Sequence, residues 1–213
     1  MAKTSNGIVR MLIPFCVVCV ALLYIIGLTV ALIVDSINAI KAYSAYIDGN
    51  YPGNSVYSQL ISLQRGYLMF YIILAALAAV AFAVFALCFA RTVFPRVKAA
   101  RLAAKEGSMA LFPTERGGAL AITCYCLVFV ALLVGIYMMA SHFGSAYRSF
   151  MSFMEDSGSL FDDYQDVYYD SIRYYITYIT VFIAGMALSA AAFVAFVFSA
   201  VKSFRINAQS KCV

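Results

Sequence analysis

Four long stretches of the chain contain only apolar, small and uncharged polar residues. Each has at least 24 residues, whereas about 20 helical residues are enough to cross the hydrocarbon core of a bilayer. The pattern therefore predicts an all-α integral membrane protein with four transmembrane helices, at residues 11–34, 66–90, 117–141 and 174–201. The first stretch is too long for the core of a signal peptide, so we interpret it as a span.

Apolar residues continue at helical spacing beyond the outer ends of these stretches. In the first connection they are Ile37, Ile40, Tyr43 and Ile47, followed by Val56, Leu60, Leu63 and Tyr67. In the third connection they are Phe143, Tyr147, Phe150 and Met154, followed by Phe161, Tyr164, Tyr168, Ile172 and Tyr175. We therefore expect the helices to extend beyond the bilayer into a short extracytoplasmic four-helix bundle.

The two halves of the chain resemble each other when one is shifted by 108 residues. This shift aligns Leu12 with Leu120, Cys16 with Cys124, Gly27 with Gly135 and Asp48 with Asp156. The match predicts two tandem helical hairpins, at residues 1–105 and 106–213, with the acidic, Tyr-rich outer extension in the second hairpin. Because each hairpin crosses the membrane twice, both would have the same orientation.

Composition and charge agree with a membrane location. Hydrophobic residues make up 64% of the chain and charged residues 12%, with a mean hydropathy of +0.89, which excludes a water-soluble or nucleic-acid-binding domain. Eleven of the 15 Lys and Arg residues lie in the termini and central connection, whereas eight of the ten acidic residues lie in the outer connections. The positive-inside rule therefore predicts cytoplasmic termini. We expect a bacterial inner (plasma) membrane, since the outer connections lack glycosylation sequons.

Small residues recur at every fourth position of two predicted spans. The second span has Ala75, Ala79 and Ala83, and the fourth has Ala187, Ala191 and Ala195. Such spacing allows close approach of helix backbones in lipid. We interpret both sets as helix-packing positions, within the bundle or against another copy.

The outer acidic residues offer a candidate metal site. Asp162, Asp166 and Asp170 are spaced four apart and would share one helix face, and carboxylate oxygens suit a divalent cation. A solvated outer face is the simpler interpretation, with a partner contact as a third. His142 is expected to be an interfacial residue, since one histidine makes neither a haem nor a zinc site.

Five cysteines lie in the cytoplasmic half of the predicted spans: Cys16, Cys19, Cys88, Cys124 and Cys126. A metal or redox cluster would need polar neighbours that favour thiolates, and the sequence offers none at that depth. Apolar packing is therefore the favoured role.

The central connection is basic. Residues 95–106 begin with Pro and precede Gly107, a pattern typical of a short helix. We expect this helix to lie at the cytoplasmic interface, where Lys98, Arg101 and Lys105 contact anionic lipid. Docking of a soluble partner is the alternative.

The absence of ionisable residues from all four spans argues against charge-coupled transport and enzymatic catalysis. We therefore expect a non-enzymatic scaffold, sensor or regulatory subunit, without a cofactor, that contacts a membrane-protein partner or further copies of itself. The alternative is a small oligomeric channel or permease for an uncharged or lipid-like solute. A pore would need the polar residues of the spans to converge on one lumen: Thr29, Thr123, Thr177, Thr180 and Ser189.

Overall fold

The computed structural model describes residues 2–49, 55–106, 119–156 and 165–209, each as one α-helix. The helices are α1 (Ala2–Gly49), α2 (Ser55–Glu106), α3 (Ala119–Asp156) and α4 (Gln165–Gln209). Each contains an apolar segment long enough to cross a membrane, which confirms the prediction of four membrane-spanning helices by length and composition. Side-chain surroundings are described for the central part of each helix.

At the end opposite the hairpin turns, α1, α2 and α4 also continue beyond the predicted spans. Residues 95–106 do not form the separate interfacial helix that the sequence suggested, because α2 continues through them to Glu106. This segment is rich in Ala, Lys and Arg, which are strong helix formers, so it extends the transmembrane helix. The basic end of α2 therefore continues beyond its apolar segment, which ends at Arg91.

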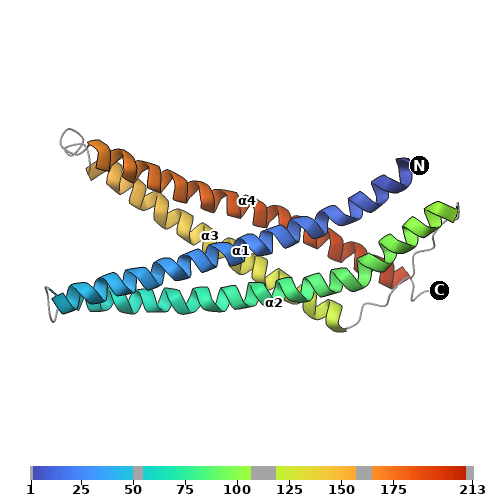
Figure 1. Cartoon of the computed structure of the whole chain (residues 1–213), viewed down its shortest axis with the longest axis horizontal. Coiled ribbons are helices and arrows are strands. Elements are labelled where there is room, and N and C mark those ends of the chain that lie inside the picture. The colour runs from blue at the N-terminus through green and yellow to red at the C-terminus, as the bar shows by residue number, and fades with distance from the viewer. Residues whose placement is uncertain (1, 50–54, 107–118, 157–164, 210–213) are drawn as a thin grey trace.

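The four helices pack as two hairpins that cross each other (Figure 1). Within each hairpin α1 packs on α2 and α3 on α4, and between the hairpins α1 packs on α4 and α2 on α3. The predicted spans of 24–28 residues are about 36–42 Å long, which exceeds the thickness of about 30 Å for a hydrocarbon core. Tilted, crossed hairpins accommodate this excess.

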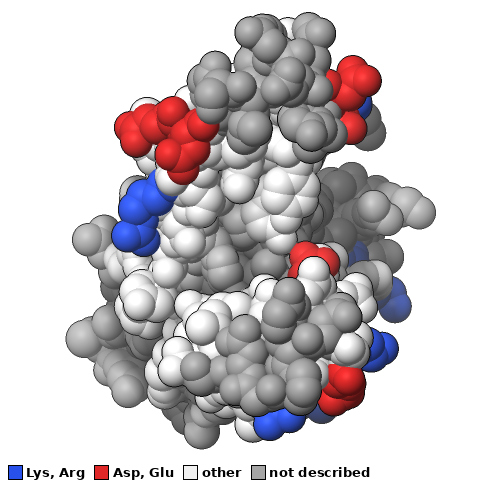
Figure 2. All heavy atoms as spheres, turned by 90° about the vertical axis from the view of Figure 1, so that its left-hand side faces the viewer, with Lys and Arg blue, Asp and Glu red and all other residues white. Residues whose placement is uncertain are grey.

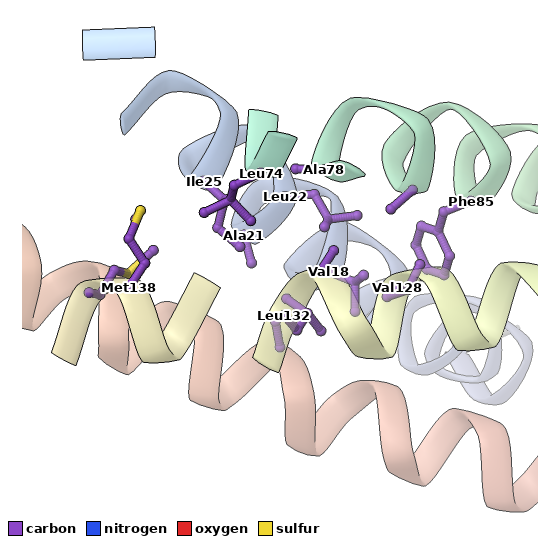
Figure 3. Packing of buried hydrophobic residues seen from close by; sticks show 14 of the residues in the cluster. Val18, Ala21, Leu22, Ile25, Leu74, Ala78, Phe85, Val128, Leu132 and Met138 are labelled. Atoms are coloured by element: carbon purple, nitrogen blue, oxygen red, sulfur yellow. The ribbon is translucent and has the colours of Figure 1, made fainter. Parts of the chain in front are cut away.

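Apolar side chains fill the region where the hairpins cross (Figure 3). Val18, Leu22 and Ile25 of α1 are fully buried there, together with Leu74 of α2 and Leu132 of α3. Other large side chains face outward along the apolar segments, among them Ile73, Leu87 and Phe198. In a membrane protein this exposure is the expected contact with lipid tails.

The hairpins diverge on the side of the crossing where α1 ends and α2 begins (Figure 1). Viewed from that side, they form two separate lobes, each with acidic side chains on its surface (Figure 2). The extensions beyond the predicted spans are helical, as the spacing of apolar residues indicated. We call the diverging extensions of the two hairpins the heads; each consists of two helices.

Candidate functional site

A cluster of polar and aromatic side chains joins the hairpins at the point where they begin to diverge. We call it the outer junction, and it consists of Asp35 of α1, Tyr71 of α2, His142 of α3, and Tyr178 and Phe182 of α4. Asp35 and His142 directly follow the first and third predicted spans. All four helices therefore contribute a side chain at the outer boundary of the predicted membrane segment.

One half of the outer junction links α2 to α3. The Tyr71 hydroxyl and Nε2 of His142 form a hydrogen bond of 2.7 Å. Tyr71 is buried and His142 is partly buried. The imidazole stacks on the Phe182 ring of α4, with 5.4 Å between ring centroids and 12° between ring planes. A single histidine thus contacts side chains from both hairpins.

The other half links α1 to α4. The Tyr178 hydroxyl donates a hydrogen bond of 3.1 Å to Oδ2 of Asp35. The Tyr178 ring meets Phe182 edge-on at 5.3 Å and lies 5.2 Å from the Tyr174 ring. Phe182 therefore separates the two hydrogen bonds and packs against a ring of each pair.

Below the outer junction, glycines allow the helices to approach closely. The Tyr24 hydroxyl of α1 donates a hydrogen bond of 2.6 Å to the carbonyl of Val181 in α4. The tyrosine ring fits against Gly185, where an added Cβ would lie 2.6 Å from Tyr24 Cε1 and 2.5 Å from Met139 Sδ. A Cβ on Gly135 would lie 2.6 Å from Cδ1 of Ile25. These contacts fix the crossing of α1 over α3 and α4.

The outer junction holds the four helices together. Within the part of the chain that is described, every buried side-chain nitrogen or oxygen has a hydrogen-bond partner. No group of three or more His, Cys, Asp or Glu side chains among the described residues could hold a metal ion. The polar atoms here instead join one hairpin to the other.

The alanines of the two predicted ladders lie mainly on outward surfaces. Ala79, Ala83, Ala187 and Ala191 are exposed, whereas Ala75 and Ala195 are partly buried. The alanines that are buried in the bundle are neighbours of the ladders: Ala78, Ala81 and Ala192. The exposed ladder positions are available to lipid or to another protein.

The structure places the other candidate residues apart from the outer junction. Asp166 and Asp170 are exposed near the start of α4, and Asp162 lies outside the described residues. Lys98 is exposed on α2, and Arg101 and Lys105 follow on the same helix, with side chains that lie outside the described part.

The cysteines are distributed over three helices. Cys124 is buried, Cys19 and Cys88 are partly buried, and Cys16 and Cys126 are exposed. Cys19, Cys88 and Cys124 belong to the apolar core or pack against it, in agreement with a packing role.

The polar residues of the spans lie at separate places. Thr29 is buried and bonds to the carbonyls of Ile25 and Ile26 in its own helix. Thr177 and Thr180 are exposed and also bond to carbonyls of their own helix. Ser189 is buried with its hydroxyl 4.0 Å from Met139 Sδ, and Thr123 is exposed.

Loss of the Tyr71 hydroxyl is expected to loosen the outer junction. Tyr71→Phe keeps the ring but removes the partner of His142 Nε2, and an unpaired buried polar atom costs about 1–3 kcal/mol. We expect a lower free energy of unfolding in detergent, measured by circular dichroism during titration with a denaturing surfactant. Tyr137→Phe is the control, because Tyr137 is 70% exposed on α3. Equal stability of the two variants would contradict the assigned hydrogen bond.

The sequence pattern gave no indication of the pairing of His142 with Tyr71. The sequence indicates an isolated interfacial residue at His142, since a lone His and one Tyr among 16 have no distinctive spacing.

Comparisons with known proteins add no further assignment: no protein-family model, curated protein or solved structure matches the chain.

Proposed function

We propose that the chain is a non-enzymatic membrane protein that acts as a scaffold, sensor or regulatory subunit of a membrane assembly. The observation that supports this most directly is the filling of the crossing by apolar side chains such as Leu22, Leu74 and Leu132. A packed interior does not favour a solute path through the bundle. The protein would therefore act through its helix surfaces and the ends of its hairpins.

Two regions are suited to contact other molecules. On the outer side are the two diverging heads, whose surfaces carry acidic and tyrosine side chains (Figure 2). On the inner side is the basic end of α2, with Arg91 and Lys98 exposed. With the termini in the cytoplasm of a bacterial inner membrane, Lys98, Arg101 and Lys105 would contact anionic lipid or an acidic partner.

A small oligomeric channel or permease is the second candidate. It is favoured by the exposure of Thr177 and Thr180 on α4, beside the exposed alanines Ala187 and Ala191 of the same helix. A solute path would then run between copies of the chain and not within one bundle. An uncharged or lipid-like solute would be the cargo, since the spans lack ionisable residues.

Site-specific photocrosslinking can separate the two functions. A photoreactive amino acid is placed at Lys98 or Tyr169, on the inner and outer ends, and at Ile73 or Phe198 as lipid-facing controls. The proposal predicts that the end positions crosslink in native membranes to one membrane protein of different sequence, which co-purifies in fixed stoichiometry. Crosslinks only between copies, combined with solute release from vesicles that contain the purified protein, would overturn it and support the channel.

A further inference from the structure

Asp35 differs from the other described carboxylates in its position. Asp48, Glu155 and Asp156 lie in the last turns of α1 and α3, and Asp166 and Asp170 lie in the first two turns of α4, so all five are near the ends of the heads. Asp35 directly follows the first predicted span, between the apolar residue Val34 and the small residue Ser36. A carboxylate at a membrane boundary is costly unless charge or hydrogen bonds compensate it.

The compensation that Asp35 receives within the described part of the chain is a hydrogen bond from a neutral group. The Tyr178 hydroxyl donates to Oδ2 at 3.1 Å, and no ion pair joins Asp35 to a described Lys or Arg. The side chain is exposed. The negative charge is therefore open to a cation from outside the chain.

Aromatic rings extend from this carboxylate along α4. Tyr174 lies one helical turn from Tyr178, and their ring centroids are 5.2 Å apart. Tyr174 is 59% exposed, Tyr178 is partly buried, and Phe182 behind them is fully buried. Phe182 fixes the Tyr178 ring by an edge-on contact at 5.3 Å. The result is an accessible aromatic surface on a rigid base, next to a carboxylate of the other hairpin.

This combination selects among cations. A calcium or magnesium ion takes six or more oxygen ligands, and most of them would have to be water here, because the described residues offer one carboxylate and the tyrosine hydroxyls. An ammonium group is satisfied by one carboxylate together with the faces of tyrosine rings. A quaternary or primary ammonium on an organic molecule therefore fits the local chemistry better than a metal ion does.

The location also allows access. Tyr178 reaches Asp35 across the place where the hairpins begin to separate, and beyond this place the hairpins form two separate lobes (Figures 1 and 2). Asp35 lies at the predicted outer boundary of the bilayer, and its side chain is exposed. An ammonium group can reach that depth on a lipid headgroup or as a free amine in solution.

We propose that Asp35, Tyr174 and Tyr178 form a binding site for an organic ammonium group at the outer side of the protein. The Tyr178 hydroxyl bonds to Oδ2 of Asp35, and the carboxylate can hold a further partner at the same time. A bound ammonium therefore adds a contact between Asp35 of α1 and the tyrosines of α4, which strengthens the link between the hairpins. This effect on the hairpins would make an organic ammonium the ligand of a sensor, and it rests on the proposed function. The binding itself can be tested without any protein partner.

Calorimetric titration of the purified protein tests the site. In nanodiscs of phosphatidylglycerol alone, tetramethylammonium chloride should bind saturably at one site, and sodium chloride at equal ionic strength should not. Asp35→Asn retains an oxygen that can accept the Tyr178 hydrogen bond, so the fold is maintained while the charge is lost. We expect at least a tenfold weaker affinity for Asp35→Asn, a several-fold weaker one for Tyr174→Ala, and no change for Asp48→Asn, which removes a carboxylate at the end of α1.

Titrations in nanodiscs of other lipids distinguish a lipid headgroup from a free amine as the source of the ammonium. If the natural ligand is a lipid headgroup, nanodiscs of phosphatidylethanolamine or phosphatidylcholine should suppress tetramethylammonium binding by competition. If it is a free amine, binding should be equal in all three lipids. The absence of saturable binding by the wild-type protein in phosphatidylglycerol, or equal affinity of Asp35→Asn, would overturn the site without bearing on the photocrosslinking result.

Discussion

Truncation of Phe182 to alanine should give the largest loss of stability in this protein. The ring is 1% exposed, stacks on His142 and meets Tyr178 edge-on. In water-soluble cores such a truncation costs about 3–5 kcal/mol. In a bilayer the denatured chain stays in lipid, so the cavity and the lost contacts contribute and the transfer from water does not. We expect about 2–3 kcal/mol less stability in surfactant-induced unfolding.

Phe198→Ala is the matched control for this prediction. Phe198 lies on the same helix but is 74% exposed, so its truncation removes contacts with lipid or detergent and leaves the bundle intact. Phe182→Leu should retain part of the packing and give an intermediate loss. If Phe182→Ala and Phe198→Ala have the same unfolding midpoint, Phe182 does not hold the outer junction together.

The features that hydropathy controls were predictable from the sequence. Lipid cannot satisfy exposed backbone groups, so an uncharged stretch such as residues 66–90 is expected to be helical. Three of the predicted spans lie entirely within observed helices, and the span at 117–141 is helical from Ala119, where the described part of α3 begins. The apolar spacing of Ile40, Tyr43 and Ile47 likewise reported the continuation of α1 to Gly49. These predictions depend on contacts that are local in the chain.

Features that depend on the relative position of the hairpins were not predictable. Gly27 and Gly135 align with each other in the predicted repeat, yet Gly27 has open space around it and Gly135 lies against Ile25. Ala79 and Ala78 are equally compatible with lipid and with a helix neighbour, so composition cannot tell which one faces inward. The same reason explains why the pairing of Tyr71 with His142 had no sequence signal.

Gly185→Ala should give the second largest loss of stability, whereas the same substitution at an exposed glycine should raise stability or leave it unchanged. An alanine stabilises a helix by up to about 1 kcal/mol relative to glycine, and Gly27→Ala, with open space around its Cβ, should show this gain or no change. At Gly185 the new Cβ would lie 2.6 Å from Tyr24 Cε1, on a ring that is held by its hydrogen bond to Val181. Overpacking of this kind costs about 1–3 kcal/mol.

A double-mutant cycle with Tyr24 identifies the cause of that loss. Tyr24→Leu removes the ring that the new Cβ would meet, together with the hydrogen bond to the Val181 carbonyl. If the clash between α1 and α4 is the cause, Gly185→Ala should cost much less in the Tyr24→Leu background than alone, with a coupling of about 1 kcal/mol or more in the free energy of unfolding. Additive losses would place the cost elsewhere, at the buried Met139 side chain, whose Sδ lies 2.5 Å from the added Cβ. A Gly185→Ala variant as stable as Gly27→Ala would mean that α1 and α4 do not cross at this glycine.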